Sequence, residues 1–181
     1  MATGTCPALG NYVNENKCLE NIAGTSAVAY YFVKGDLSEQ PVLTGCTYST
    51  PKFKTGKGLY KFDLKDGTQQ IQGEGQGNNA GFALTYNATI DAVNKEIAVL
   101  RRALQNLDIC IIVPDGATDS QIMYDPNHRV KVESGGIHSD TGAAVGDERQ
   151  TTLEFHLEGV LYQNLYVTAP EDGWDSLLAT E

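Results

Sequence analysis

The chain has 181 residues, 41% of them hydrophobic, which suits one domain with a hydrophobic core. Its 13 Lys and Arg residues against 23 Asp and Glu residues give a net charge of −10, and such a surface repels the phosphates of nucleic acid. This balance argues against a protein that grips DNA, although it allows one past which DNA slides. The longest apolar run, residues 109–113, is far shorter than the roughly 20 residues of a membrane helix.

The N-terminal residues and the cysteines predict the cellular compartment of the protein. Residues 1–9 lack the basic and apolar regions of a signal peptide. The four cysteines form no CxxC pair, so we expect free thiols in a reducing cytosol rather than a disulfide framework.

The first third of the chain contains one clear strand. Residues 1–23 show little periodicity and are predicted to form an N-terminal arm. Residues 27–33 (AVAYYFV) are aromatic and β-branched, which predicts a buried strand. Residues 37–58 are polar and contain several Gly and Pro residues, so we expect a long loop with a short strand near residues 46–48.

A pair of alternating segments follows. Residues 59–65 alternate apolar and polar side chains, and the Asp66-Gly67 dipeptide that follows predicts a hairpin with a returning strand at residues 68–73. Residues 73–81 (GEGQGNNAG) are expected to be a flexible connection. Residues 82–91 (FALTYNATID) alternate again and predict a half-buried strand.

One helix is predicted, over about residues 91–106. Apolar side chains recur there at steps of four and three residues and form one stripe: Val93, Ile97, Leu100, Leu104 and Leu107. Asp91 or Asn94 is suited to cap its start, and Asn106 marks its end. We expect this stripe to lie against a β-sheet.

The remaining elements are predicted strands and turns. The strands are expected at residues 109–113, 120–124, 129–133, 151–159 and 162–168, with a glycine-rich loop at 135–148. An acidic tail, residues 169–181, contains the only tryptophan, Trp174. Strands, one helix and more strands predict a mainly β fold, an antiparallel β-sandwich or barrel flanked by one α-helix, over residues 24–168.

Three motifs carry residues of functional types. The run Gly75 to Ala80 fits a G-x-G-x-x-A pattern, but a strand is predicted after it where a dinucleotide site needs a helix. The tripeptide His138-Ser139-Asp140 contains the residue types of a catalytic triad, but triads are assembled in space, so a polar loop is the favoured interpretation. We therefore expect no catalytic residue and no cofactor.

The third motif is a row of polar residues on one strand. Glu154, His156 and Glu158 share a face of the predicted strand. Residues four apart on a strand are separated by about 13 Å, more than the roughly 5 to 9.5 Å between glycosidase carboxylates. A solvated face, or one that meets a neighbouring subunit, is favoured over a metal site.

Residues 59–168 resemble the tail tube proteins of long-tailed bacteriophages and the related tube proteins of contractile injection systems. The segments that carry the resemblance are FALTYNATID, the helix DAVNKEIAVLRRALQN, the buried strand DICIIVPDG, and RVKVESGGIHSDTGAAVGDERQTTLEFHLEG. The resemblance implies a structural virion protein without catalytic residues, made in the bacterial cytoplasm. Its hexameric rings would stack into a tube with other tail proteins attached, strands would line the lumen, and double-stranded DNA would pass through without specific binding.

Within this interpretation, Glu154 and Glu158 are candidates for lumen-facing residues. Three alternatives stay open, one of them a secreted adhesin-like sandwich, against which the lack of a signal peptide weighs. The chain could be another virion component, either a capsid decoration protein or a tail terminator protein. It could also be an enzyme or a ligand-binding module, which would require a concave pocket with converging polar groups.

Overall fold

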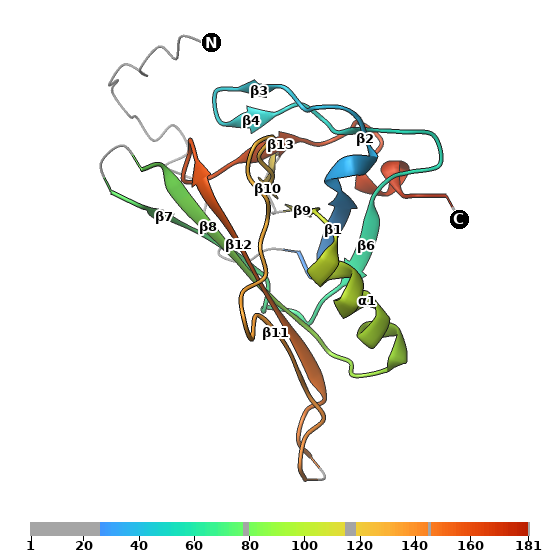
Figure 1. Cartoon of the computed structure of the whole chain (residues 1–181). Helices are drawn as coiled ribbons and strands as arrows, with labels where there is room; N and C mark the ends of the chain where they lie inside the picture. Colours follow the sequence, from blue (N-terminus) through green and yellow to red (C-terminus); the bar gives the residue numbers. More distant parts are fainter. Residues whose placement is uncertain (1–25, 78–79, 115–118, 145, 181) are drawn as a thin grey trace, which may run out of the picture.

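The computed structural model describes residues 26–77, 80–114, 119–144 and 146–180. The described chain is mainly β, with one α-helix and two short 3-10 helices (Figure 1). In chain order the elements are β1 Val28–Val33, η1 Lys34–Asp36, β2 Leu37–Glu39, β3 Leu43–Thr44, β4 Thr47–Tyr48, β5 Lys52–Phe53, β6 Tyr60–Asp63, β7 Gln70–Gly75, β8 Phe82–Ile90, α1 Lys95–Asn106, β9 Ile109–Val113, β10 Asp119–Met123, β11 Ile137–Asp140, β12 Gln150–Val160, β13 Tyr166–Thr168 and η2 Trp174–Leu177.

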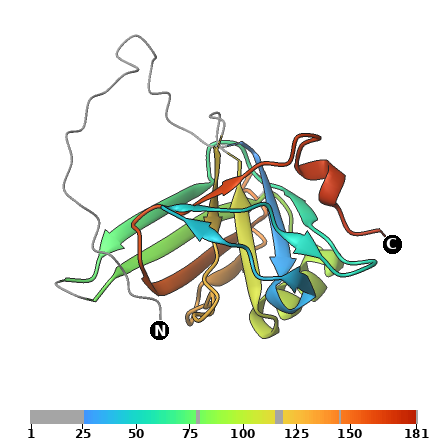
Figure 2. The same ribbon diagram turned by 90° about the horizontal axis from the view of Figure 1, so that it is seen from above.

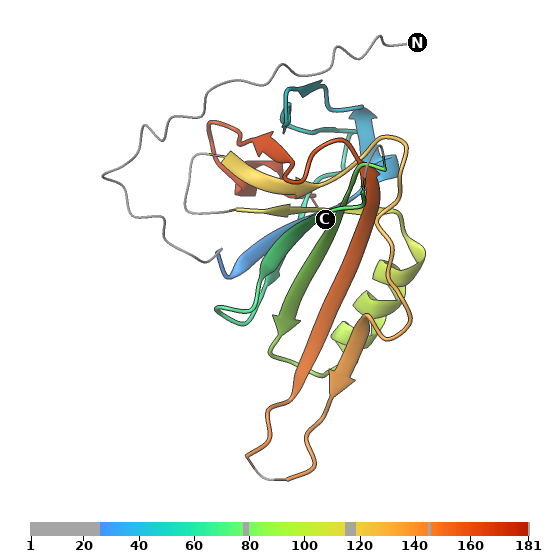
Figure 3. The same cartoon turned by 90° about the vertical axis from the view of Figure 1, so that its left-hand side faces the viewer.

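The strands form two main sheets and a small one. The seven-stranded sheet has the order β3-β4-β13-β10-β9-β1-β6, the four-stranded sheet the order β11-β12-β8-β7, and β2 pairs with β5. Both main sheets are open, since among the described residues neither pairs its first strand with its last. β8 and β12 are the longest strands, and the hairpin of β11 with the start of β12 extends away from the rest of the fold (Figure 3).

The core lies between the two main sheets. Tyr31 of β1 contacts Tyr86 of β8 and Phe155 of β12, with ring centroids 6.3 and 6.4 Å apart. On the opposite face of β1, Phe32 packs against Phe53 of β5 at 5.6 Å. The seven-stranded sheet is therefore covered on both faces. Burial on both faces explains why the sequences of β1 and β9 are apolar throughout and do not alternate with polar residues.

The turn at Asp66-Gly67 corrects one prediction. Gly67 has a φ of +70°, as the dipeptide predicts for a turn. The flanking strands do not pair with each other, however, because β6 pairs with β1 and β7 pairs with β8. The predicted hairpin is wrong. The turn instead carries the chain from one sheet to the other, and the returning strand is β7, two residues later than expected.

The segment 37–58 is a second correction. In place of one long loop it contains the short strands β2, β3, β4 and β5, and the short strand expected near residues 46–48 is present as β4. Leu37 and Tyr48 are buried in the chain's own core, and the Tyr48 ring meets the Tyr124 ring edge-on at 5.1 Å. The chain therefore orders this segment by itself. The predicted arm, residues 1–23, lies outside the described residues.

The helix lies between the two sheets. α1 begins four residues later than predicted and ends at Asn106 as predicted; the Asn94 side chain caps it by accepting a hydrogen bond from the Ile97 amide at 2.9 Å. Leu104 is buried, while Ile97 and Leu100 are partly buried against the core. No helix in the described part of the chain is both long and apolar enough to cross a membrane.

The C-terminal segment packs on the domain instead of forming a free tail. Trp174 is 7% exposed, and its ring nitrogen donates a hydrogen bond to Ser120 Oγ at 2.9 Å. Leu178 then forms a parallel bridge with Leu59, directly before β6. Figure 2 shows this red segment crossing the molecule to the side where the C-terminus lies.

Candidate functional site

The four-stranded sheet has one apolar and one polar face, because its side chains alternate. The apolar face packs into the core through residues such as Leu84, Tyr86, Leu153 and Phe155. We call the opposite side the outer face. Its residues, placed by the strand registers, are Gln70, Gln72, Glu74, Ala83, Thr85, Asn87, Thr89, His138, Asp140, Gln150, Thr152, Glu154, His156 and Glu158.

The strands of the outer face, β7, β8, β11 and β12, carry acidic side chains and no lysine or arginine, and the nearest lysine, Lys131, forms a bridge with β12 from outside these strands. The acidic side chains are four carboxylates, Glu74, Asp140, Glu154 and Glu158. The other side chains of the face are mostly neutral and hydrogen-bonding, so the sheet presents water with a surface that is acidic and hydrophilic along its whole length.

The two residues predicted as lumen candidates both lie on this face. Glu154 accepts a hydrogen bond from His156 Nε2 at 2.9 Å, and His156 Nδ1 lies 3.1 Å from Thr85 Oγ1. Because a carboxylate only accepts, the proton of a neutral His156 is on Nε2, and the Thr85 hydroxyl donates to Nδ1. Both ring nitrogens of His156 therefore have a hydrogen-bond partner, which leaves neither open for a metal ion.

Glu158 lies where the strand pairing is interrupted. The register between β12 and β8 shifts between Leu157 and Val160, so two residues of β12 stand opposite one of β8. Lys131, at the rim of the sheet, approaches Glu158 to 3.4 Å. Among the described residues, Glu158 is thus the one carboxylate of the outer face that pairs with a lysine or arginine.

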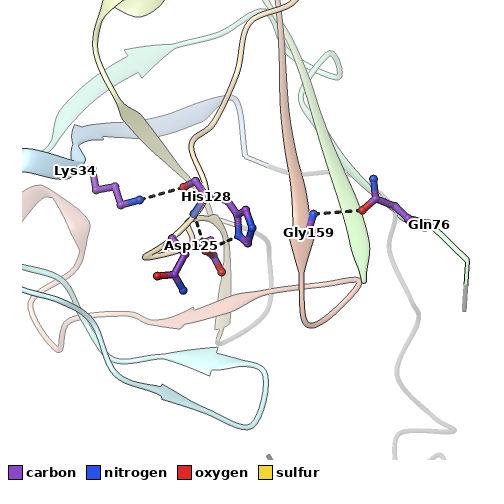
Figure 4. A network of polar contacts seen from close by, with 6 residues as sticks. Lys34, Gln76, Asp125, His128 and Gly159 are labelled. Atoms are coloured by element: carbon purple, nitrogen blue, oxygen red, sulfur yellow. Dashed lines mark hydrogen bonds and ion pairs between the residues drawn. The ribbon is translucent and has the colours of Figure 1, made fainter. Parts of the chain in front are cut away.

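A polar pocket of about 420 Å³ lies beside this interruption (Figure 4). Asp125 Oδ1 lies 2.8 Å from His128 Nδ1, Lys34 Nζ donates to the His128 carbonyl at 3.0 Å, and Gln76 accepts from the Gly159 amide at 3.3 Å. Several polar groups that line the pocket are thus paired with groups of the same chain, which leaves fewer of them free for a ligand.

The two edges of the four-stranded sheet differ in what covers them. Beside β11, Arg101 of α1 donates to the Ile137 carbonyl at 3.1 Å and to Ser139 Oγ at 3.0 Å. Beside β7, the Gln163 side chain donates to the Gly73 carbonyl at 2.7 Å. Each edge strand pairs with one neighbour only, so most of its outward backbone groups remain open.

The remaining motifs fall on strands and turns. The Gly75 to Ala80 run starts at the end of β7 and leads to β8, so a strand follows it as predicted; residues 78–79 lie outside the described part. His138, Ser139 and Asp140 lie on β11, where Ser139 turns toward Thr151 and its neighbours turn to the outer face. Three successive residues of one strand do not converge on one reacting atom.

Sequence reasoning missed Glu74 and Asp140 as members of the outer face. The sequence predicts a flexible connection over residues 73–81, whereas the alternation of Gln70, Gln72 and Glu74 continues as a strand. It places Asp140 in the glycine-rich loop, whereas Asp140 lies on β11. Period-two alternation continued past Gly73 would have found Glu74.

Comparison with known proteins gives no relative: no family model, no curated protein and no solved structure matches this chain.

Proposed function

We propose that this chain is a structural virion protein, a tail tube subunit that assembles into stacked hexameric rings. The observation that carries the proposal is the outer face, a long sheet surface with four carboxylates and no lysine or arginine on its strands. In this role the two packed sheets and α1 are an antiparallel sandwich of the tail-tube type, and the outer face lines the lumen.

The electrostatics of a DNA channel support this assignment. Contacts between phosphates and Lys or Arg side chains dominate nonspecific DNA affinity. A wall that carried such side chains would hold a passing genome and slow its ejection. A wall of carboxylates, hydroxyls and amides stays hydrated and repels the phosphates, so the duplex passes without adhering.

The open edges of the four-stranded sheet support assembly through strands. β7 and β11 are the two edges of that sheet. Joining β7 of one copy to β11 of the next would continue the sheet around a ring and close its open edges. The hexameric count and the stacking of rings come from the resemblance of residues 59–168 to tail tube proteins.

Electron microscopy of the purified protein tests the assembly. We expect hollow rings or tubes with an open lumen. A strictly monomeric protein at high concentration contradicts the proposal. Rings that do not stack, or copies that attach singly to a capsid surface, favour the second virion role, a tail terminator or capsid decoration protein.

A DNA-binding assay on assembled tubes tests the lumen. The wild-type protein should form no salt-sensitive complex with short duplex DNA. The variant Glu154→Lys/Glu158→Lys reverses two charges of the outer face, and its tubes should retain DNA at low salt and release it as salt rises. The matched control, Glu171→Lys/Asp172→Lys, makes the same change in charge near the C-terminus and should retain none. Equal retention by both double variants would contradict the placement of the outer face in the lumen.

A ligand-binding module remains the competing class, because the polar pocket beside Gly159 gathers several polar groups. Several of its polar groups are paired with groups of the same chain, which favours a structural role. The microscopy separates the two classes, since a ligand-binding module has no need to form rings.

A further inference from the structure

A threonine, a histidine and a glutamate of the outer face form a hydrogen-bonded row. Thr85 on β8 lies directly opposite His156 on β12, and Thr85 Oγ1 is 3.1 Å from His156 Nδ1. The other ring nitrogen, Nε2, is 2.9 Å from Glu154 Oε1. A hydroxyl, an imidazole and a carboxylate joined in this order are the parts of an activated nucleophile: the attacking group, its base and the group that positions the base.

The direction of these hydrogen bonds suits His156 to act as the base. Glu154 accepts the proton of Nε2, so Nδ1 of the neutral ring accepts the hydrogen bond of the Thr85 hydroxyl. When Nδ1 takes up that proton, the Glu154 carboxylate stabilises the imidazolium that forms. The two ring nitrogens have the opposite roles to those in the Ser-His-Asp triad, but the path of the proton is the same.

A second threonine–histidine pair on the outer face lacks this connection. His138 on β11 lies opposite Thr152 on β12, as His156 lies opposite Thr85. The Thr152 hydroxyl, however, is directed at the His138 carbonyl at 3.4 Å, and within the described part of the chain no hydrogen bond joins it to the His138 ring. Cross-strand pairing alone therefore does not produce the arrangement at Thr85, and Thr152 is a matched control for it.

Two amide side chains flank Thr85. Gln72 on β7 is its direct partner in the pairing of β7 with β8, and Asn87 follows two residues later on the same face of β8. Among the described residues, neither side-chain amide has a hydrogen-bond partner. Their N–H groups are therefore free to donate to an oxygen that becomes negative beside Thr85, as the donors of an oxyanion hole do.

We propose that Thr85, His156 and Glu154 form an acyl-transfer site that hydrolyses small neutral esters. Thr85 Oγ1 attacks the carbonyl carbon of the ester, and the hydroxyl proton moves to His156 Nδ1. The bond between that carbon and the alcohol oxygen then breaks, the alcohol leaves with the proton, and the acyl group stays on Thr85. Water attacks the acyl group by the same path and releases a carboxylic acid and the free Thr85 hydroxyl. Glu154 is a positioning residue, because it acts through His156.

The surroundings of the site select the class of ester. Thr85 is half-buried, and the His156 side chain is 23% exposed on a sheet face that water reaches, so a small ester can approach from solvent. The carboxylates of the outer face repel anionic substrates, which favours a neutral ester with a good leaving group. The activity goes beyond the proposed assembly and does not depend on it, because all of these residues belong to one chain.

Acylation by p-nitrophenyl acetate tests the site. The folded protein is incubated with this ester and mapped by mass spectrometry, which separates an acetyl group on Thr85 from acetylated lysines. We expect an acetyl group on Thr85 and roughly a hundredfold less on Thr152, the contribution of a positioned base. The acetyl group should disappear after the ester is removed, as water completes the second step.

The base is tested by His156→Gln, with His138→Gln as the matched control. Acetylation of Thr85 should be lost in His156→Gln and unchanged in His138→Gln, with both variants folded by circular dichroism. Equal acetylation of Thr85 and Thr152 in the wild type, no acetyl group on Thr85, a stable one, or one that still forms in His156→Gln would each overturn the proposal.

The role of Glu154 is tested by the pH dependence of acetylation. Glu154→Gln keeps an acceptor for His156 Nε2 but removes its charge, so protonation of the ring becomes less favourable. Half-maximal acetylation of Thr85 should therefore occur at a lower pH than in the wild type. Glu158 and Lys131, the other charged residues beside His156 on this face, are unchanged in the variant. An unshifted pH profile would contradict the positioning role of Glu154.

Discussion

The Tyr31 hydroxyl donates a hydrogen bond to the Tyr86 hydroxyl at 3.0 Å, and this bond joins the two main sheets through the centre of the core. Tyr86 in turn donates to Gln69 Oε1 at 2.9 Å, and Gln69 donates to the Ser26 carbonyl at 2.6 Å. Burial raises the pKa of the Tyr31 hydroxyl well above its ordinary value. The network links both sheets to the start of β1.

Replacing Tyr86 by Phe should lower the free energy of unfolding by about 1–3 kcal/mol, because it removes two buried hydrogen bonds and leaves the Tyr31 hydroxyl without its acceptor. Urea denaturation measures the change. Tyr60→Phe removes a hydroxyl from a residue that is 44% exposed and should shift the free energy by less than about 0.5 kcal/mol. Equal effects of the two variants would show that the inter-sheet bond adds nothing.

Acid should loosen the C-terminal segment through Asp175. Its carboxylate accepts hydrogen bonds from the Tyr30 hydroxyl at 2.7 Å and from Lys61 Nζ at 2.9 Å, and these bonds hold the pKa of Asp175 below its ordinary value of 3.8. A lowered carboxyl pKa adds stability that is present above pH 3.8 and is lost as the pH falls through the lowered value. Trp174, the only tryptophan, reports the change by its fluorescence.

The expected result is a red shift of Trp174 emission in acid that precedes the loss of far-ultraviolet circular dichroism. Asp175→Asn cannot form the ionic contact with Lys61, so its emission should lack this separate acid step. Asp172→Asn, a change at an exposed neighbouring carboxylate, should keep it. If Asp175→Asn retains the wild-type acid step, another group controls the docking of the segment.

Leu104 should be the residue of α1 that contributes most to stability. It is 5% exposed, and Leu104→Ala should cost about 2–5 kcal/mol through lost burial and the cavity left behind. Val99, on the opposite side of the helix and 73% exposed, is the control, and Val99→Ala should change little. Thermal melts of the two variants measure the difference, and a Leu104→Ala melt that matches the wild type would mean that the helix does not pack through this residue.

A side chain at Gly159 should destabilise the protein. Its φ is +76°, and a Cβ there would lie 3.1 Å from His128 Nε2. Gly159→Ala combines a left-handed backbone with a steric contact and should cost more than the roughly 1 kcal/mol of the backbone alone. Gly67 isolates the backbone part, since its φ is +70° and open space surrounds it. Gly159→Ala should lower the free energy of unfolding by more than Gly67→Ala does, and adding His128→Ala should remove this excess. If the excess remains in the double variant, the steric contact with His128 is excluded.

Sequence patterns predicted the elements that are determined by residues close together in the chain. The four-three spacing of apolar residues and the Asn94 cap gave α1, and the alternation of FALTYNATI gave β8 together with its buried face. The outer-face positions of Glu154 and Glu158 also follow from period two within one strand. In each case the side chains that decide the structure lie within a few residues of one another.

The pairing of strands that are distant in the sequence could not be predicted from such patterns. Asp66-Gly67 specifies a turn, but the partners of β6 and β7 are chosen by burial against β1 and β8. The strands β2 to β5 are two or three residues long, and they form because Leu37 and Tyr48 reach a core built by other segments. Tertiary contacts decide such elements, and a single sequence does not display them.

β9 lies inside the seven-stranded sheet, with β1 and β10 on either side, and all five of its residues are buried. Its backbone amides have no route to water short of separating two strand ladders and opening both covered faces at once. They should therefore exchange their hydrogens for deuterium only on global unfolding, more slowly than the amides of the edge strands β6 and β7. Burial likewise raises the pKa of the Cys110 thiol in this strand, so labelling of Cys110 by a thiol reagent should follow the same global opening.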